Sequence, residues 1–167
     1  MRIALWREVE GSGSPQIQDL IYRKVIEFTE SPLITARVTL KNPTEEPRLP
    51  GLWIQNIIYP GGADELLFFR PSTAGLRAGT HDKSVDTVHG DEFVKDPIAG
   101  WTATLGRGTD AGAVFLCDYN YLRWTYNAIG VDTTEWFYDR VRLRPGSEWE
   151  TSVRMVPLRG FSRVNHA

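Results

Sequence analysis

The sequence lacks several features that would indicate a function directly. Its single cysteine, Cys117, excludes an internal disulfide and a cysteine-rich zinc site. Its 19 basic and 21 acidic side chains leave a formal charge of −2, so we expect neither a nucleic-acid partner nor a membrane surface as partner. No run approaches the roughly 20 apolar residues of a membrane helix. The N-terminal segment becomes charged too early for a secretory signal, and the sequence assigns no compartment.

Motifs for nucleotide and nucleophile chemistry are also absent. There is no glycine-rich dinucleotide fingerprint, no phosphate-binding P-loop and no Gly-x-Ser-x-Gly elbow. Cys117 lies in an apolar run, which favours a small core residue over a nucleophile. We therefore expect no nucleotide chemistry and no cofactor.

What the sequence does contain is the period of β-strands. In residues 33–40 every second side chain is apolar (Ile34, Ala36, Val38 and Leu40), which is typical of a strand with one face on a core. The segment Arg144-Pro145-Gly146-Ser147 predicts a type II turn. Further strands are predicted in residues 17–28, 52–59, 65–70, 101–105, 113–119, 121–128, 133–143 and 148–156.

These runs predict an all-β chain: an antiparallel β-sandwich of roughly eight to ten strands. The composition, 41% hydrophobic and 24% charged, is that of a folded protein, and the 167 residues are expected to form one domain over 1–167. Residues 71–97 are mostly polar without a sustained period, so they predict one long loop.

That predicted loop holds two of the three histidines, His81 and His89, together with five acidic residues. Imidazole and carboxylate groups can bind a metal ion, but the spacing matches no known metal-binding signature. A solvated acidic loop is therefore favoured over an ordered metal site, and no metal ligand is assigned.

The strand predicted over residues 133–143 carries the candidate binding surface. Its alternation groups Trp136, Tyr138, Arg140 and Arg142 on one face, while the face with Phe137, Val141 and Leu143 is expected to lie on the core. The preceding strand offers Trp124 and Tyr126 in the same way. Aromatic rings can cover the C–H face of a sugar, and arginine can form forked bonds to hydroxyl or carboxylate groups. Ordinary cross-strand pairing is the alternative.

General acid–base catalysis needs a close pair of titratable groups. Glu135 and Asp139 are four residues apart on one strand, about 13 Å, which is too far for them to act together. Glu135 can pair with His81 or His89 only if the loop folds back over the sheet.

Three further segments are typical of one family. They are Asn42-Pro43-Thr44-Glu45 at a strand end, Gly100-Trp101 at a strand entry, and the hairpin of residues 141–149 before a last strand that ends at Pro157. Together they resemble the galactose-mutarotase-like (supersandwich) β-sandwich domains. The resemblance implies a concave sheet that faces carbohydrate. Mutarotases of this class use a histidine acid and a glutamate base, and this chain shows no such pair at matching positions.

The sequence thus favours a non-catalytic carbohydrate-binding β-sandwich, with Trp124, Tyr126, Trp136, Tyr138, Arg140 and Arg142 as the binding surface. The alternative is a structural or assembly subunit of a filament, shell or larger complex, whose partner is another protein subunit. A third possibility is an aldose-epimerase-like or glycan-processing enzyme that uses Glu135 with a loop histidine.

Overall fold

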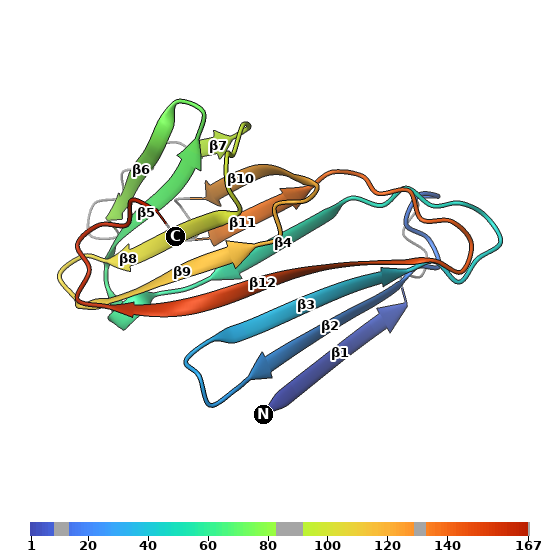
Figure 1. Ribbon diagram of the computed structural model, residues 1–167, viewed down its shortest axis with the longest axis horizontal. Helices are drawn as coiled ribbons and strands as arrows, with labels where there is room; N and C mark the ends of the chain where they lie inside the picture. The colour runs from blue at the N-terminus through green and yellow to red at the C-terminus, as the bar shows by residue number, and fades with distance from the viewer. Residues whose placement is uncertain (9–13, 83–91, 129–132, 167) are drawn as a thin grey trace.

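The alternating runs form two antiparallel sheets, one of eight strands and one of four, in the computed structural model of the chain (Figure 1). The structure describes residues 1–8, 14–82, 92–128 and 133–166. Hydrophobic side chains of both sheets meet between the layers, which confirms the predicted antiparallel β-sandwich.

The large sheet has the order β1 (Arg2–Glu8), β2 (Ile21–Phe28), β3 (Ile34–Lys41), β12 (Glu148–Arg159), β9 (Ala111–Cys117), β8 (Trp101–Gly106), β5 (Glu65–Ser72) and β6 (Gly75–Asp82). The small sheet has the order β4 (Leu52–Ile57), β11 (Thr133–Tyr138), β10 (Leu122–Ala128) and β7 (Glu92–Val94). A short 3-10 turn, η1 (Pro60–Gly62), links β4 to β5. No helix in the described residues is long and apolar enough to span a membrane.

The main core lies between the two layers. Val38, Phe115 and Val153 of the large sheet pack there against Ile54 and Trp136 of the small sheet. A second apolar cluster covers the opposite face of the large sheet, where Val164 of the C-terminal segment packs with these side chains: Phe69, Trp101, Ala103, Leu105 and Val114. The large sheet is therefore packed on both faces along its central strands.

The buried Asn42 joins two loops. Its side-chain amide donates to the carbonyl of Leu143 at 3.2 Å, and its backbone carbonyl accepts from the amide of Gly146. Gly146 has φ of 72° and Ser147 donates back to Arg144 at 3.0 Å, as the predicted turn requires. The Asn-Pro segment and the Pro-Gly turn, more than 100 residues apart in sequence, thus form one structural unit.

Several sequence boundaries need correction. The segment 71–97 is not one long loop, because Gly75–Asp82 forms β6 against β5 and Glu92–Val94 forms β7. The strand predicted over 133–143 ends at Tyr138, and only Leu143 makes an isolated bridge beyond it. The N-terminal residues, to which no strand was assigned, form β1.

Candidate functional site

The faces of β11 are the reverse of those predicted. Trp136 is 0% exposed and lies in the core, with its ring centroid 5.3 Å from that of Phe115. Tyr138 is buried beside it, 5.8 Å from the ring of Trp149. The prediction that these two rings face outward is therefore wrong. The predicted alternation includes Val141 and Leu143. These two residues lie beyond the end of β11 and do not share its period.

The other face of the small sheet is lined by aromatic rings from all four strands. We call it the aromatic face; its rings are those of Trp53 (β4), Phe93 (β7), Trp124 and Tyr126 (β10), and Phe137 (β11). The pairing register places them together, because Phe137 is opposite both Trp53 and Trp124, and Phe93 is opposite Tyr126. The two predicted residues Trp124 and Tyr126 are thus on a common surface, but without Trp136 and Tyr138.

The rings of the aromatic face contact one another. Trp53 stacks on Phe137 with centroids 4.7 Å apart, and Phe93 stacks on Tyr126 at 4.1 Å. Trp124 lies 5.9 Å from Phe137 and 6.0 Å from Phe93, so it joins the two stacked pairs. Trp53 remains 53% exposed. The result is a continuous apolar surface whose rings hold each other in place.

A buried carboxylate lies at the base of this surface. Glu135 is 1% exposed and accepts hydrogen bonds from Trp53 Nε1 at 2.6 Å and from Gln55 Nε2 at 3.1 Å. The hydroxyl of Thr133 donates to the same carboxylate. These donors satisfy a charge that would otherwise be costly to bury. The bond from the indole also fixes the orientation of the exposed Trp53 ring.

The two arginines of the predicted surface lie beyond β11. Arg140 and Arg142 are both exposed, and the backbone amide of Arg140 donates to Asp139 at 2.9 Å. This bond and an ion pair with Arg123 at 3.1 Å lower the pKa of Asp139. Arg123 also lies 5.0 Å from the ring of Trp124, so a cation borders the aromatic face.

The space between the layers is not uniformly apolar. Toward β5 and β8 it contains the buried side chains of Arg70, Thr102 and Thr104. The hydroxyl of Thr104 is 3.4 Å from that of Thr134, which also accepts from Asn127 Nδ2 at 2.9 Å. Sequence alternation could not reveal this polar half, since threonine fits either face of a strand.

Cys117 is buried in the main core, as predicted. Burial raises the pKa of its thiol to about 12, so the reactive thiolate is strongly disfavoured. The described residues contain no group of three or more His, Cys, Asp or Glu side chains that could hold a metal ion. The side chain of His81 and all of His89 lie outside the part of the chain that is described, so their pairing with Glu135 stays untested.

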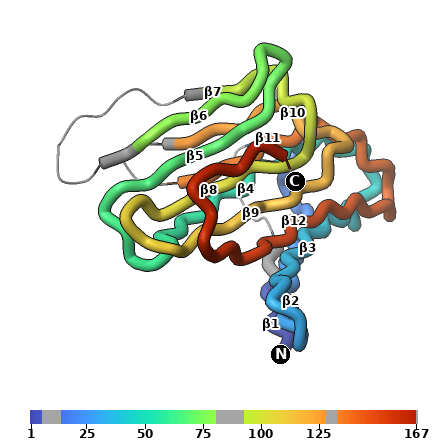
Figure 2. The backbone as a smooth tube through the Cα atoms, turned by 60° about the vertical axis from the view of Figure 1, so that its left-hand side comes forward, coloured from blue at the N-terminus to red at the C-terminus, as the bar shows by residue number. Residues whose placement is uncertain are grey.

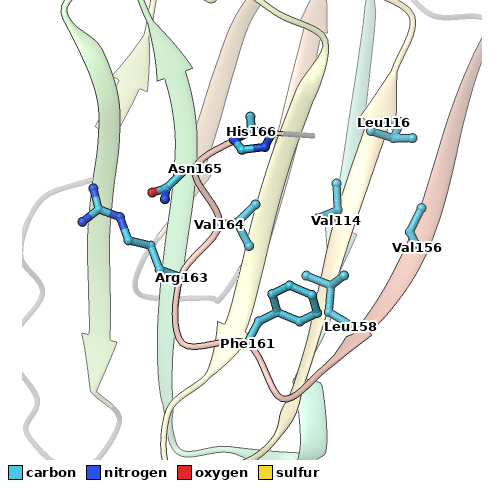
Figure 3. Close-up of a pocket in the computed structure, with 9 residues that line it drawn as sticks. All are labelled: Val114, Leu116, Val156, Leu158, Phe161, Arg163, Val164, Asn165 and His166. Carbon is cyan, nitrogen blue, oxygen red and sulfur yellow. The ribbon is translucent and has the colours of Figure 1, made fainter.

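A groove lies on the other side of the molecule, between the large sheet and the C-terminal segment (Figure 3). It encloses about 480 Å³. Its floor is apolar, formed by Val114 and Leu116 of β9 with Val156 and Leu158 of β12, and Phe161 closes one end. Its polar side chains come from the C-terminal segment, as Arg163, Asn165 and His166.

Comparison with known proteins identifies the fold. No family model and no curated protein matches the chain. Among solved structures, a protein of Synechocystis sp. PCC 6803 superposes with a TM-score of 0.68 and 6% identity, over 95% of this chain and 62% of the other. An assigned aldose 1-epimerase of Klebsiella pneumoniae gives 0.66 and 14%, over 95% and 51%. A galactose mutarotase related enzyme of Lactobacillus acidophilus gives 0.62 and 9%, over 98% and 70%.

These similarities confirm the resemblance at the level of the fold: the chain has a galactose-mutarotase-like β-sandwich. At 14% identity or less they show nothing finer. The chain spans 62% and 51% of the length of the first two structures.

Proposed function

We propose that this chain is a non-catalytic carbohydrate-binding β-sandwich that holds a glycan against the aromatic face. Two of its structural neighbours are named for sugar chemistry, as an aldose 1-epimerase and a galactose mutarotase related enzyme. The fold is therefore one that accommodates sugars. The proposed binding surface lies on the opposite side of β11 from the predicted residues Trp136 and Tyr138.

The observation that carries the proposal is the fixed orientation of Trp53. Its ring is exposed yet held from both sides, by stacking on Phe137 and by the hydrogen bond to Glu135. A ring that is already ordered loses little conformational entropy when it binds a ligand. Such a ring can cover the C–H face of a pyranose, while Gln55 beside it offers polar atoms to hydroxyl groups.

The surroundings of Glu135 favour binding over catalysis. A general acid or base must reach the proton that it transfers. The Glu135 carboxylate lies beneath the rings and already accepts three hydrogen bonds. Its role in the proposal is to position Trp53. Arg140 and Arg142 stay in the proposal as exposed donors at the end of β11.

The test is binding to an array of galactose- and glucose-containing oligosaccharides, followed by titration calorimetry with the best ligand. Trp53→Ala and Trp124→Ala should each weaken binding by roughly tenfold or more, since a central tryptophan commonly contributes about 2 kcal/mol. Phe161→Ala is the matched control, because Phe161 is an exposed aromatic residue in the groove on the far side. Absence of binding to every glycan, or equal loss in the control, would contradict the proposal.

A further inference from the structure

The large sheet is wider than the small sheet, so part of it has no second layer. β4, the edge strand of the small sheet, lies over β3 and β12, because Ile54 packs with Val38 and Val153. β1 and β2 continue past this edge. We call these two strands the wing; they project from the sandwich in both views (Figures 1 and 2). No described strand of the small sheet pairs with them or lies over them.

The two faces of the wing differ in chemistry. On the outer face Glu27 forms ion pairs with Arg2 and Arg37, each at 3.5 Å. On the inner face Ile3 stands opposite Ile26, and Leu5 stands opposite Lys24. Ile3 is 41% and Leu5 is 57% exposed. Ile3, Leu5 and Ile26 form an apolar patch on this face beside the charged Lys24, and nothing in the described residues covers the patch.

The boundary between the wing and β4 is an open groove. It is lined by Ile26 and Ile34 of the large sheet and by Asn56 of β4. The side-chain amide nitrogen of Asn56 is buried and has no hydrogen-bond acceptor among the described residues. A buried donor without an acceptor is costly, so this nitrogen indicates that a further polar group belongs at the groove.

Both strands that border the uncovered region are sheet edges. β1 is the edge of the large sheet and β4 is the edge of the small sheet. The sequence of β4, Leu-Trp-Ile-Gln-Asn-Ile, contains no charge and no proline. Charged residues and proline normally protect an edge strand from pairing with another chain. β4 is thus available to pair with a further strand. The space between the edges β1 and β4 is open to strands that extend the two sheets.

We propose that a second copy of this chain covers the wing in a two-fold symmetric dimer. A two-fold axis that runs along the strands, midway between the layers, exchanges the two layers. It places the wing of each copy in the layer of the other's small sheet, with β1 of one copy beside β4 of the other. Each inner wing face then covers its equivalent, which is the self-complementary contact of a two-fold interface.

A second copy fits better than an unrelated strand. A single added strand would pair with one edge and leave the other open, whereas the two-fold arrangement pairs β1 and β4 of both copies. It also buries Ile3 and Leu5 together and keeps the charged outer face of the wing in solvent. This association goes beyond the proposed glycan binding and does not depend on it.

The test is light scattering after size-exclusion chromatography, with the full chain over a wide concentration series. The expected mass is twice the 18.9 kDa of the chain. Leu5→Lys should raise the dissociation constant by about tenfold or more, because it replaces an apolar contact by a second charge opposite Lys24 on the covered face. Ala4→Lys is the matched control: Ala4 is the neighbouring exposed residue on the outer face, opposite Val25, and its substitution should leave the dimer intact.

A second variant guards against a folding defect in β1. Ile57→Lys adds a charge to the exposed end of β4, in the other layer, and should also dissociate the dimer. Circular dichroism confirms that each variant is folded. A wild-type monomer at all concentrations would overturn the proposal. So would a dimer that survives both Leu5→Lys and Ile57→Lys, equal dissociation by Ala4→Lys, or an oligomer that keeps growing.

Discussion

The two faces of the small sheet carry the same kinds of residue in opposite roles. Trp136 and Phe137 are neighbours in sequence, yet one ring is fully buried between the layers and the other lies under Trp53 on the aromatic face. The hydrogen bonding of the two tryptophans adds to the contrast. The indole nitrogen of the buried Trp136 has no partner among the described residues, whereas that of the exposed Trp53 is bonded to Glu135. The inner ring fills volume, and the outer ring is held in an orientation.

The largest effect is expected on the inner face. Trp136→Ala should lower the free energy of unfolding by about 3–5 kcal/mol, because it leaves a large cavity between the layers. Trp136→Phe should cost less, since it keeps most of the volume and removes a nitrogen that has no partner. Chemical denaturation measures both. A small loss of stability in Trp136→Ala would show that the inner face does not act as core.

An intermediate effect is expected at Glu135. Glu135→Leu leaves the donors of Trp53, Gln55 and Thr133 without their acceptor, which should cost about 1–3 kcal/mol of stability. The Trp53 ring should also become more mobile, while Glu135→Gln keeps one acceptor oxygen and should be milder. Thermal denaturation and tryptophan fluorescence anisotropy measure the two consequences. Unchanged anisotropy in Glu135→Leu would show that stacking alone orients Trp53.

The smallest effect, when counted for one pH unit, concerns alkaline pH. Burial raises the pKa of the Cys117 thiol from 9.0 to about 12, and burial also raises the pKa of the Tyr138 hydroxyl. Above pH 9 the unfolded chain releases the thiol proton while the folded chain keeps it. Stability should therefore fall as pH rises from 9 toward 12, by at most about 1.4 kcal/mol per pH unit for each group. Cys117→Ala should make this slope shallower, as denaturation at several pH values would reveal; an unchanged slope would indicate that water reaches the thiol.

The sequence was sufficient where a strand has a neighbour on each side and one face on the core. The alternation of residues 33–40 predicted β3, and the Pro145-Gly146 turn predicted the approach to β12. It was insufficient for β6 and β1, the two edges of the large sheet. β6 contains Gly75 and Gly79 and few apolar residues, because an edge strand need not bury an alternating set.

The candidate site was harder to predict than the fold. Two of the three donors to the Glu135 carboxylate come from β4, about 80 positions earlier in the sequence, and the register between β4 and β11 decides which side chains meet. The sequence-based assignment of the core-facing side of β11 depended on where the strand ends. Val141 and Leu143 suggested one assignment, whereas burial of Trp136 between the layers imposed the other. Only the three-dimensional pairing distinguishes the two.

The alternation of β11 also constrains how this chain can diverge over generations. Substitutions in β11 act on one side chain each, but inserting or deleting one residue before Glu135 would send every later ring of the strand to the opposite side. The core and the aromatic face would be exchanged in a single step. The turn at Gly108, where φ is 75° and the surroundings are open, carries no such restriction. Length variation among descendants of this sequence should therefore accumulate at turns of that kind and be purged from β11.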